Sequence, residues 1–163
     1  AYMTSAILYS SLSGNTKLLA QTIYDVIKED CKYCGETKEI DADRVYVGFW
    51  TNKGTADDKT MEFLKTLHNK EIFLFGTAGF GGSQEYFDGI LQRTKQNIDA
   101  SNTVIGTYMC QGKMPISVRN RYEKLKESPS CPANIDMLIE NFDKAVSHPD
   151  QNDLDKLIQI LQK

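Results

Sequence analysis

Short apolar runs alternate with amphipathic stretches over the first two thirds of the chain. Such runs are typical of strands buried on both faces of a parallel sheet, because neither face of the strand is exposed to water. They fall at about 5–10, 45–49, 72–75 and 103–109. Amphipathic helices are predicted between them, at about 16–29, at 57–68 and after Ser83, which we expect to cap its helix. This alternation predicts an α/β fold, an open parallel sheet with helices on both faces.

The second strand of this sheet is the weakest element of the pattern. Residues 30–43 are polar and poorly periodic, and only Lys38-Glu39-Ile40 is a candidate strand. A doubly wound sheet with the order 2-1-3-4-5 places its second strand at an edge. We therefore expect this order, with a second strand that is short or missing.

Residues 111–150 depart from the alternation of strands and helices. Helices are predicted near 118–126 and 135–146, and prolines at 129–132 mark the break between them. A final helix is predicted at 153–161, with Asn152 as its N-cap, and Thr55 with Asp58 resembles a capping box for the helix at 57–68. We expect one domain over 1–163 that carries a helical extension at about 111–150.

Composition narrows the class of protein. The chain has 163 residues, of which 40% are hydrophobic and 25% are charged, as in ordinary globular domains. A net charge of −3 gives no basic surface for nucleic acid. No apolar run has the length of a membrane span and no signal-peptide pattern opens the chain. We expect a cytoplasmic protein that binds neither nucleic acid nor membranes.

The cysteines and histidines form no recognisable reactive set. Cys31 and Cys34 make a C-x-x-C, but without a second pair or a nearby histidine it does not predict a zinc site. Its place in a polar stretch after the first helix differs from that of a redox pair, so two reduced surface thiols are expected. His68 is placed at a helix end and His148 in a turn. No catalytic residue and no metal ligand is predicted.

The segment from Ser11 to Thr16, Ser-Leu-Ser-Gly-Asn-Thr, is the most informative part of the chain. It joins the first strand to the first helix, where free N–H groups and the helix dipole favour an anion. The hydroxyls of Ser11, Ser13 and Thr16 can donate to phosphate oxygens, and Gly14 permits close approach of the backbone. The segment has no lysine or arginine, so neutral donors would bind the anion. A turn that merely caps the helix is the alternative.

This segment resembles the FMN-phosphate loop of flavodoxins, whose pattern is Thr/Ser-x-Thr/Ser-Gly-Asn-Thr. The resemblance implies a flavodoxin-like fold with FMN beyond the carboxyl ends of the strands, where strand order reverses. Three predicted loops leave that edge, and their chemistry suits the phosphate, the ring and the ring edge. The residues predicted to bind this cofactor are Ser11, Leu12, Ser13, Gly14, Asn15, Thr16, Trp50, Thr51, Asn52, Lys53, Gly54, Thr77, Ala78, Gly79, Phe80, Gly81 and Gly82.

Side-chain type suggests individual roles within these loops. Trp50 and Phe80 can stack on a flat ring, or pack onto the protein itself. Gly54 would let a peptide flip when the flavin gains a proton, and Lys53 would lie near the ring or at a solvated loop tip. Residues 110–113, at the carboxyl end of the last strand, could line a pocket over the ring or form an ordinary turn.

A wider resemblance covers nearly the whole chain. It is similar to one flavodoxin subgroup, the flavodoxin-like proteins associated with bilirubin reductase in gut anaerobes. The segments that carry this resemblance are 48–54, 75–83, 109–115, 140–143 and 147–150. The resemblance implies an electron carrier that serves a partner reductase, with bilirubin reductase as the candidate. In such a carrier the flavin performs the chemistry, while the protein sets its potential and excludes water.

Two alternative functions stay open. The chain could be an FMN-dependent NAD(P)H reductase of quinones or other small acceptors, with residues 111–150 as the cover of a substrate site. It could instead be a flavin-free assembly subunit of a reductase complex. The sequence predicts no oligomeric state.

Overall fold

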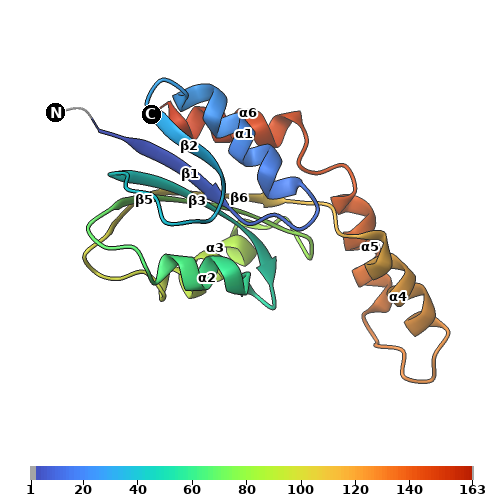
Figure 1. The fold of residues 1–163 in the computed structure, drawn as a ribbon. Coiled ribbons are helices and arrows are strands. Elements are labelled where there is room, and N and C mark those ends of the chain that lie inside the picture. The colour runs from blue at the N-terminus through green and yellow to red at the C-terminus, as the bar shows by residue number, and fades with distance from the viewer. Residues whose placement is uncertain (1–2, 163) are drawn as a thin grey trace.

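A five-stranded parallel sheet forms the centre of the molecule. The computed structural model describes residues 3–162. The sheet has the order β2-β1-β3-β5-β6, and a short strand β4 pairs antiparallel with β3 beside it (Figure 1). Without β4, this is the predicted 2-1-3-4-5 order. The strands are β1 (Ser5–Tyr9), β2 (Cys31–Glu36), β3 (Arg44–Asn52), β4 (Thr55–Ala56), β5 (Glu71–Ala78) and β6 (Thr103–Gln111).

Helices cover both faces of the sheet, as the alternation predicts. Figure 1 shows α1 (Asn15–Ile27) and α6 (Gln151–Leu161) on one face, with α2 (Asp58–Leu64) and α3 (Gln84–Lys95) on the other. Leu19 and Leu157 belong to the core on the α1 side, and Leu64 and Ile90 to the core on the α2 side. Among residues 3–162, no helix has both the length and the apolarity needed to cross a membrane.

Two further helices make an arm at the carboxyl edge of the sheet. Figure 1 shows α4 (Ile116–Lys126) and α5 (Ile135–Ala145) projecting away from the sheet as a hairpin. This arm has its own small core, built around Tyr122, Ile135 and Phe142. The two helices fall within the segment 111–150, where the sequence predicts helices.

The predicted second strand at 38–40 is wrong, and so is the expectation that this strand is short or missing. The strand β2 covers six residues, Cys31–Glu36, and runs parallel to β1. Its register shifts so that Ser5 pairs with Cys31 but Ala6 pairs with Tyr33, which leaves Lys32 in a bulge. An edge strand that is only half-buried has no continuous apolar run for sequence reasoning to detect. Cys31 and Cys34 are free, but they are half-buried in this strand rather than exposed in a polar loop.

Two of the predicted helix caps are wrong by a few residues. Asp57, not a Thr55–Asp58 box, caps α2, and its side chain accepts a hydrogen bond from the Thr60 N–H. Asp150, not Asn152, caps α6. Neighbouring aspartates and asparagines offer the same capping chemistry, so sequence alone does not separate them. The Ser83 cap of α3 is confirmed.

Two glycines on adjacent strands make room for two phenylalanine rings. Gly48 pairs with Phe75, and Phe49 pairs with Gly76, across β3 and β5. A Cβ atom added to Gly48 would lie 2.4 Å from the Phe75 ring, and one added to Gly76 would lie 2.3 Å from the Phe49 ring. Each ring therefore packs flat against the backbone of the neighbouring strand.

Replacing Gly76 with alanine should destabilise the fold, because the new methyl group overlaps the buried Phe49 ring. We expect the free energy of unfolding in urea to fall by about 1–3 kcal/mol. Gly81→Ala is the matched control, because its Cβ would meet Tyr86 at an ordinary 3.5 Å. A Gly76→Ala variant as stable as Gly81→Ala would contradict this account of the packing.

Candidate functional site

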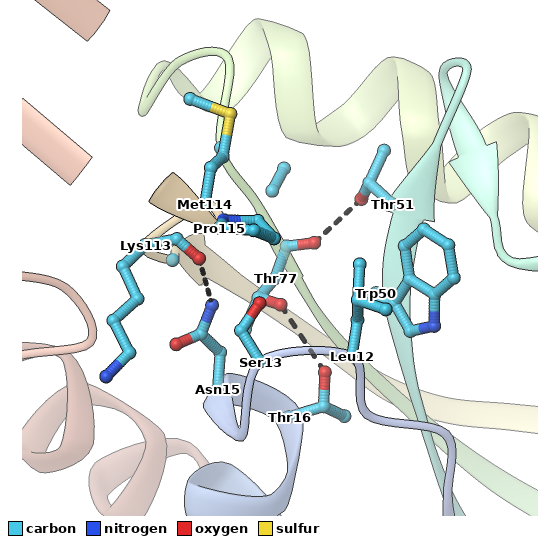
Figure 2. Close-up of a pocket in the computed structure, with 13 residues that line it drawn as sticks. Leu12, Ser13, Asn15, Thr16, Trp50, Thr51, Thr77, Lys113, Met114 and Pro115 are labelled. Carbon is cyan, nitrogen blue, oxygen red and sulfur yellow. Dashed lines mark hydrogen bonds between the residues drawn. The ribbon is translucent and has the colours of Figure 1, made fainter. Parts of the chain in front are cut away.

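The carboxyl ends of the central strands enclose a small cavity. It has a volume of about 60 Å³ and lies between the start of α1, the ends of β3 and β5, and the turn after β6 (Figure 2). The structure thus brings parts of all three predicted loops together, with residues 112–115 as a fourth segment. The lining residues are Leu12, Ser13, Asn15, Thr16, Trp50, Thr51, Thr77, Ala78, Gly79, Gly112, Lys113, Met114 and Pro115.

The loop from Ser11 to Thr16 has the geometry of an anion-binding helix start. Gly14 is the N-cap of α1 and has a left-handed backbone, with φ of 84°. The Ser11 hydroxyl oxygen accepts hydrogen bonds from the N–H groups of Gly14 (3.1 Å) and Lys17 (3.4 Å). The N–H groups of Asn15 and Thr16 also belong to the first turn, where donors have no acceptor within the helix. Ser13 lines the cavity beside them.

Thr16 has a different role from the one predicted for its hydroxyl. The residue is fully buried, and its hydroxyl donates to the Phe49 carbonyl of β3 at 2.9 Å. The same oxygen lies 3.4 Å from the Thr77 hydroxyl, as the dashed line in Figure 2 shows. The hydroxyl proton is therefore engaged in holding α1 against the sheet, and only the Thr16 N–H remains for an anion.

Asn15 joins the loop to the turn after β6. Its Nδ2 donates to the Lys113 carbonyl at 2.8 Å, across 98 residues of sequence (Figure 2). The Gly112 N–H donates to the Ala78 carbonyl at 3.0 Å, which ties the turn to β5 as well. A Cβ on Gly112 would lie 2.6 Å from Asn15 Nδ2, so a larger residue here would displace the Asn15 amide. Of the two alternatives for residues 110–113, Gly112 and Lys113 do line a pocket.

The second predicted loop is mostly a strand. β3 continues through Trp50, Thr51 and Asn52 and then turns back into β4, so the prediction of a loop over these residues is wrong. Lys53 and Gly54 form the turn, with φ of 53° and 83°. Two residues with positive φ between antiparallel strands are typical of a tight hairpin turn, because the twist of such a turn matches the twist of the two strands that it joins. Only Trp50 and Thr51 of this segment line the cavity.

The Gly54 carbonyl has a partner that opposes the predicted peptide flip. It accepts a hydrogen bond of 2.7 Å from Arg93 Nε on α3. A flip at this peptide would have to break that charge-assisted bond. Lys53 lies at the hairpin tip, outside the residues that line the cavity.

The third loop is divided between the cavity and its rim. Thr77 and Ala78 are the last residues of β5, so the prediction of a loop at these two positions is wrong. They line the cavity together with Gly79, whereas Gly81 and Gly82 lie outside its lining. Phe80 is 47% exposed, and its carbonyl accepts a hydrogen bond from Asn141 on α5. Leu12, on the loop from Ser11 to Thr16, is 59% exposed. Exposed apolar side chains beside a cavity are typical of a binding surface.

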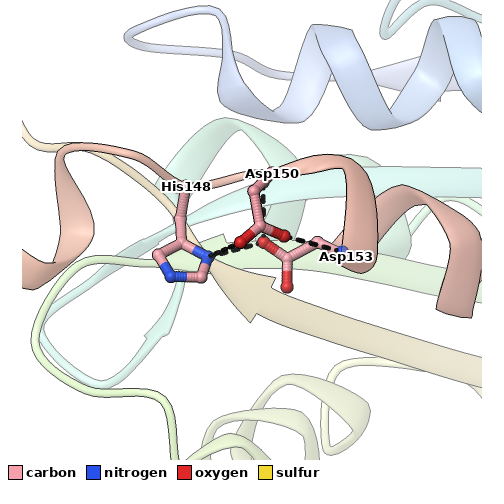
Figure 3. A group of neighbouring side chains, drawn as sticks. All are labelled: His148, Asp150 and Asp153. Atoms are coloured by element: carbon pink, nitrogen blue, oxygen red, sulfur yellow. Dashed lines mark hydrogen bonds and ion pairs between the residues drawn. The ribbon is translucent and has the colours of Figure 1, made fainter.

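His148, Asp150 and Asp153 form a cluster where α6 begins (Figure 3). His148 Nδ1 lies 2.6 Å from Asp153 Oδ2 and 3.8 Å from Asp150 Oδ2. Asp150 and Asp153 cap the helix reciprocally, and the hydrogen bond from the Asp153 backbone lowers the pKa of the Asp150 carboxyl. The cluster thus anchors the start of α6, and the His148 carbonyl accepts from the Lys113 N–H at 3.0 Å.

Cys110 lies near this cluster but is poorly suited to act as a nucleophile. It is 3% exposed, and burial raises the pKa of its thiol, as do the nearby charges of Asp153 and Asp150. Tyr108 on the same strand donates its hydroxyl to the Asp153 carbonyl at 2.7 Å. Both side chains support the fold behind the cavity.

Comparison with known proteins decides the family. The model of the family described as Flavodoxin domain matches residues 6–162. The chain belongs to the flavodoxin family. Two flavodoxin relatives carry the name flavodoxin-like domain-containing protein BilS. The one from Clostridium symbiosum (strain WAL-14163) is 36% identical, and the one from Clostridioides difficile (strain CD3) is 37% identical. Each alignment covers 93% of this chain and 90% of the relative.

Solved flavodoxin structures agree with this assignment. The two-electron reduced flavodoxin of Megasphaera elsdenii is 27% identical, with a TM-score of 0.51 over 87% of this chain and 100% of its own. A flavoprotein from Lactobacillus acidophilus NCFM in complex with FMN is 18% identical, with a TM-score of 0.52 over 66% of this chain and 93% of its own. The second likeness supports the fold alone.

Thr16→Val should destabilise the protein, because it leaves the Phe49 carbonyl without its donor while keeping the side-chain volume. We expect the free energy of unfolding in urea to fall by about 1–3 kcal/mol. Thr22→Val is a control, since the Thr22 hydroxyl donates to Leu18 within the exposed face of α1. Equal stability of Thr16→Val and the unmodified protein would contradict the structural role of this hydroxyl.

Thiol labelling should separate the cysteines by burial. At about pH 8 an ordinary thiol is partly ionised, whereas the raised pKa of Cys110 keeps it protonated, and its thiolate fraction grows only as the pH rises further. We expect iodoacetamide to alkylate the exposed Cys131 at least about tenfold faster than Cys110, measured by peptide mass spectrometry. Similar alkylation rates for Cys131 and Cys110 in the folded protein would contradict the burial of Cys110.

Proposed function

We propose that this flavodoxin binds one FMN noncovalently at the carboxyl edge of its sheet and passes electrons to a partner reductase. The observation that carries the proposal is the cavity where the helix-start loop Ser11 to Thr16 meets Trp50, Thr51 and Thr77. Membership of the flavodoxin family supports the cofactor. When bound, FMN would supply the redox chemistry, and the protein would bind and orient it.

The residues at this edge suit the chemical parts of FMN. The first turn of α1 offers N–H donors to the phosphate, and the Ser13 hydroxyl stands beside them. Within the described chain, no Asp or Glu lines the cavity to repel an anion. Trp50 and the exposed Phe80 offer aromatic faces near the rim.

The size of the cavity bears on where the ring would lie. The cavity, of about 60 Å³, is small, and in this proposal the ring lies at its rim. A Cβ on Gly79 would lie 2.3 Å from Met114 Cγ, so this side chain packs closely against Gly79 in the wall of the cavity. Methionine is unbranched and adapts its shape readily, which suits a residue that must give way to a ring.

Electron transfer, rather than catalysis on a small substrate, fits the side chains around the cavity. In the described part of the chain, the lining residues include no carboxylate, imidazole or thiol that could move a proton. A ring held at the rim would stay accessible to a second protein. The partner in this proposal is bilirubin reductase, because the chain resembles the flavodoxin-like proteins associated with that enzyme and is similar to two proteins named BilS.

One observation favours a second candidate, an FMN-dependent NAD(P)H reductase of small acceptors. The α4–α5 arm stands beside the cavity, and Asn141 on this arm contacts the Phe80 loop. Such an arm would cover a small substrate over the ring. Anaerobic mixing with NADPH distinguishes the candidates: the carrier should stay oxidised without another protein, whereas the enzyme would be bleached rapidly.

Replacing Ser13 with aspartate should weaken phosphate binding, because it puts a negative charge beside the first turn of α1. We expect Ser13→Asp to weaken FMN binding at least about 30-fold, measured by quenching of flavin fluorescence. Ser13→Asn is the matched control, because it has nearly the same volume without the charge. FMN binding unaffected by Ser13→Asp would reject this loop as the phosphate site, and no FMN binding by the unmodified protein would favour the flavin-free subunit.

A further inference from the structure

Lys113 is a cation on the turn after β6 that faces the phosphate loop. It lines the small cavity together with Ser13 and Asn15. It also lines a neighbouring cavity of about 270 Å³, on the other side of the loop, together with Gly14 and His148. Figure 2 shows the Lys113 side chain running beside Asn15 near the start of α1. A lysine far away in the sequence thus lies beside a loop that has no charged residue of its own.

The position of Lys113 is fixed by its backbone alone. Its carbonyl accepts from Asn15 Nδ2 at 2.8 Å, and its N–H donates to the His148 carbonyl at 3.0 Å. Within residues 3–162, its ammonium group makes no ion pair. The side chain can therefore be changed without removing a contact that holds the fold together.

The charges around Lys113 favour an anion on both sides of the loop. Of the described residues that line the two cavities, none is an aspartate or glutamate. The start of α1 adds the positive end of its dipole. The nearby carboxylates of Asp150 and Asp153 are engaged with His148 and with the capping of α6. An unpaired ammonium beside a helix start, with no competing carboxylate in either lining, is available to a phosphate ester.

We propose that Lys113 is a specificity-determining residue that supplies the phosphate loop with its positive charge and selects flavins that carry a terminal phosphate. This inference rests on the proposed function, because it assigns a residue to the same cofactor site. It revises the expectation, drawn from residues 11–16 alone, that only neutral donors bind the anion. The contact is charge-assisted but exposed, so salt screens it.

The test compares FMN with riboflavin, which lacks the phosphate. Apoprotein with Lys113→Gln is titrated with both flavins, and binding is followed by fluorescence quenching at about 20 mM and about 0.5 M salt. We expect the Kd for FMN to rise about tenfold at low salt, while the Kd for riboflavin changes less than about twofold. The salt dependence of FMN binding should also weaken in this variant, and Lys113→Arg should restore most of the affinity.

Lys124→Gln is the control, because it removes the same charge from the exposed surface of α4. It should leave both dissociation constants within about twofold of the unmodified protein. Equal losses for FMN and riboflavin, or no change for FMN in Lys113→Gln, would reject the role of Lys113 while leaving FMN binding itself intact. Failure of the unmodified protein to bind FMN would overturn the proposed function together with this inference.

Discussion

The hydrogen bond from the Thr16 hydroxyl to the Phe49 carbonyl sets the position of α1 on the sheet. It places the first turn of the helix at the carboxyl edge of the sheet, beside the other segments that line the cavity. The contact depends on Gly48, because a Cβ there would lie 2.9 Å from the Thr16 methyl group as well as against the Phe75 ring. Small residues in the strands thus allow a helix start to approach closely enough to serve as a donor group for an anion.

Four segments share the site, and hydrogen bonds through main-chain atoms join them. Thr51 donates to the Thr77 carbonyl, Gly112 to the Ala78 carbonyl and Asn15 to the Lys113 carbonyl. Because main-chain carbonyls are the acceptors, the acceptor in each contact does not depend on side-chain identity at that position. In our proposal, the side chains of Ser13 and Lys113, which line the same cavity, determine what binds. In each segment, main-chain atoms thus join the site together, while side chains provide the contacts with a ligand.

Sequence reasoning succeeded where the signal is local. The central strands follow from continuous apolar runs, and their order is the one that the resemblance of the Ser11 to Thr16 segment to flavodoxins implies. It failed for β2, since burial at a sheet edge comes from pairing with β1 rather than from an apolar run. It also failed for Trp50 to Asn52, which are held as a strand by the returning β4. Lys113 was considered as part of a pocket over the ring or of an ordinary turn, but not as a neighbour of the Ser11 to Thr16 loop, because its approach to Asn15 spans 98 residues.

The α4–α5 arm leaves the body at Lys113 and returns at His148, and one hydrogen bond joins these two points. Its helices pack mainly on each other, around Tyr122, Ile135 and Phe142. A segment closed at its base in this way can change in length or sequence while the sheet keeps its topology. The arm can therefore alter the surface beside the cavity without disturbing the strands that end there.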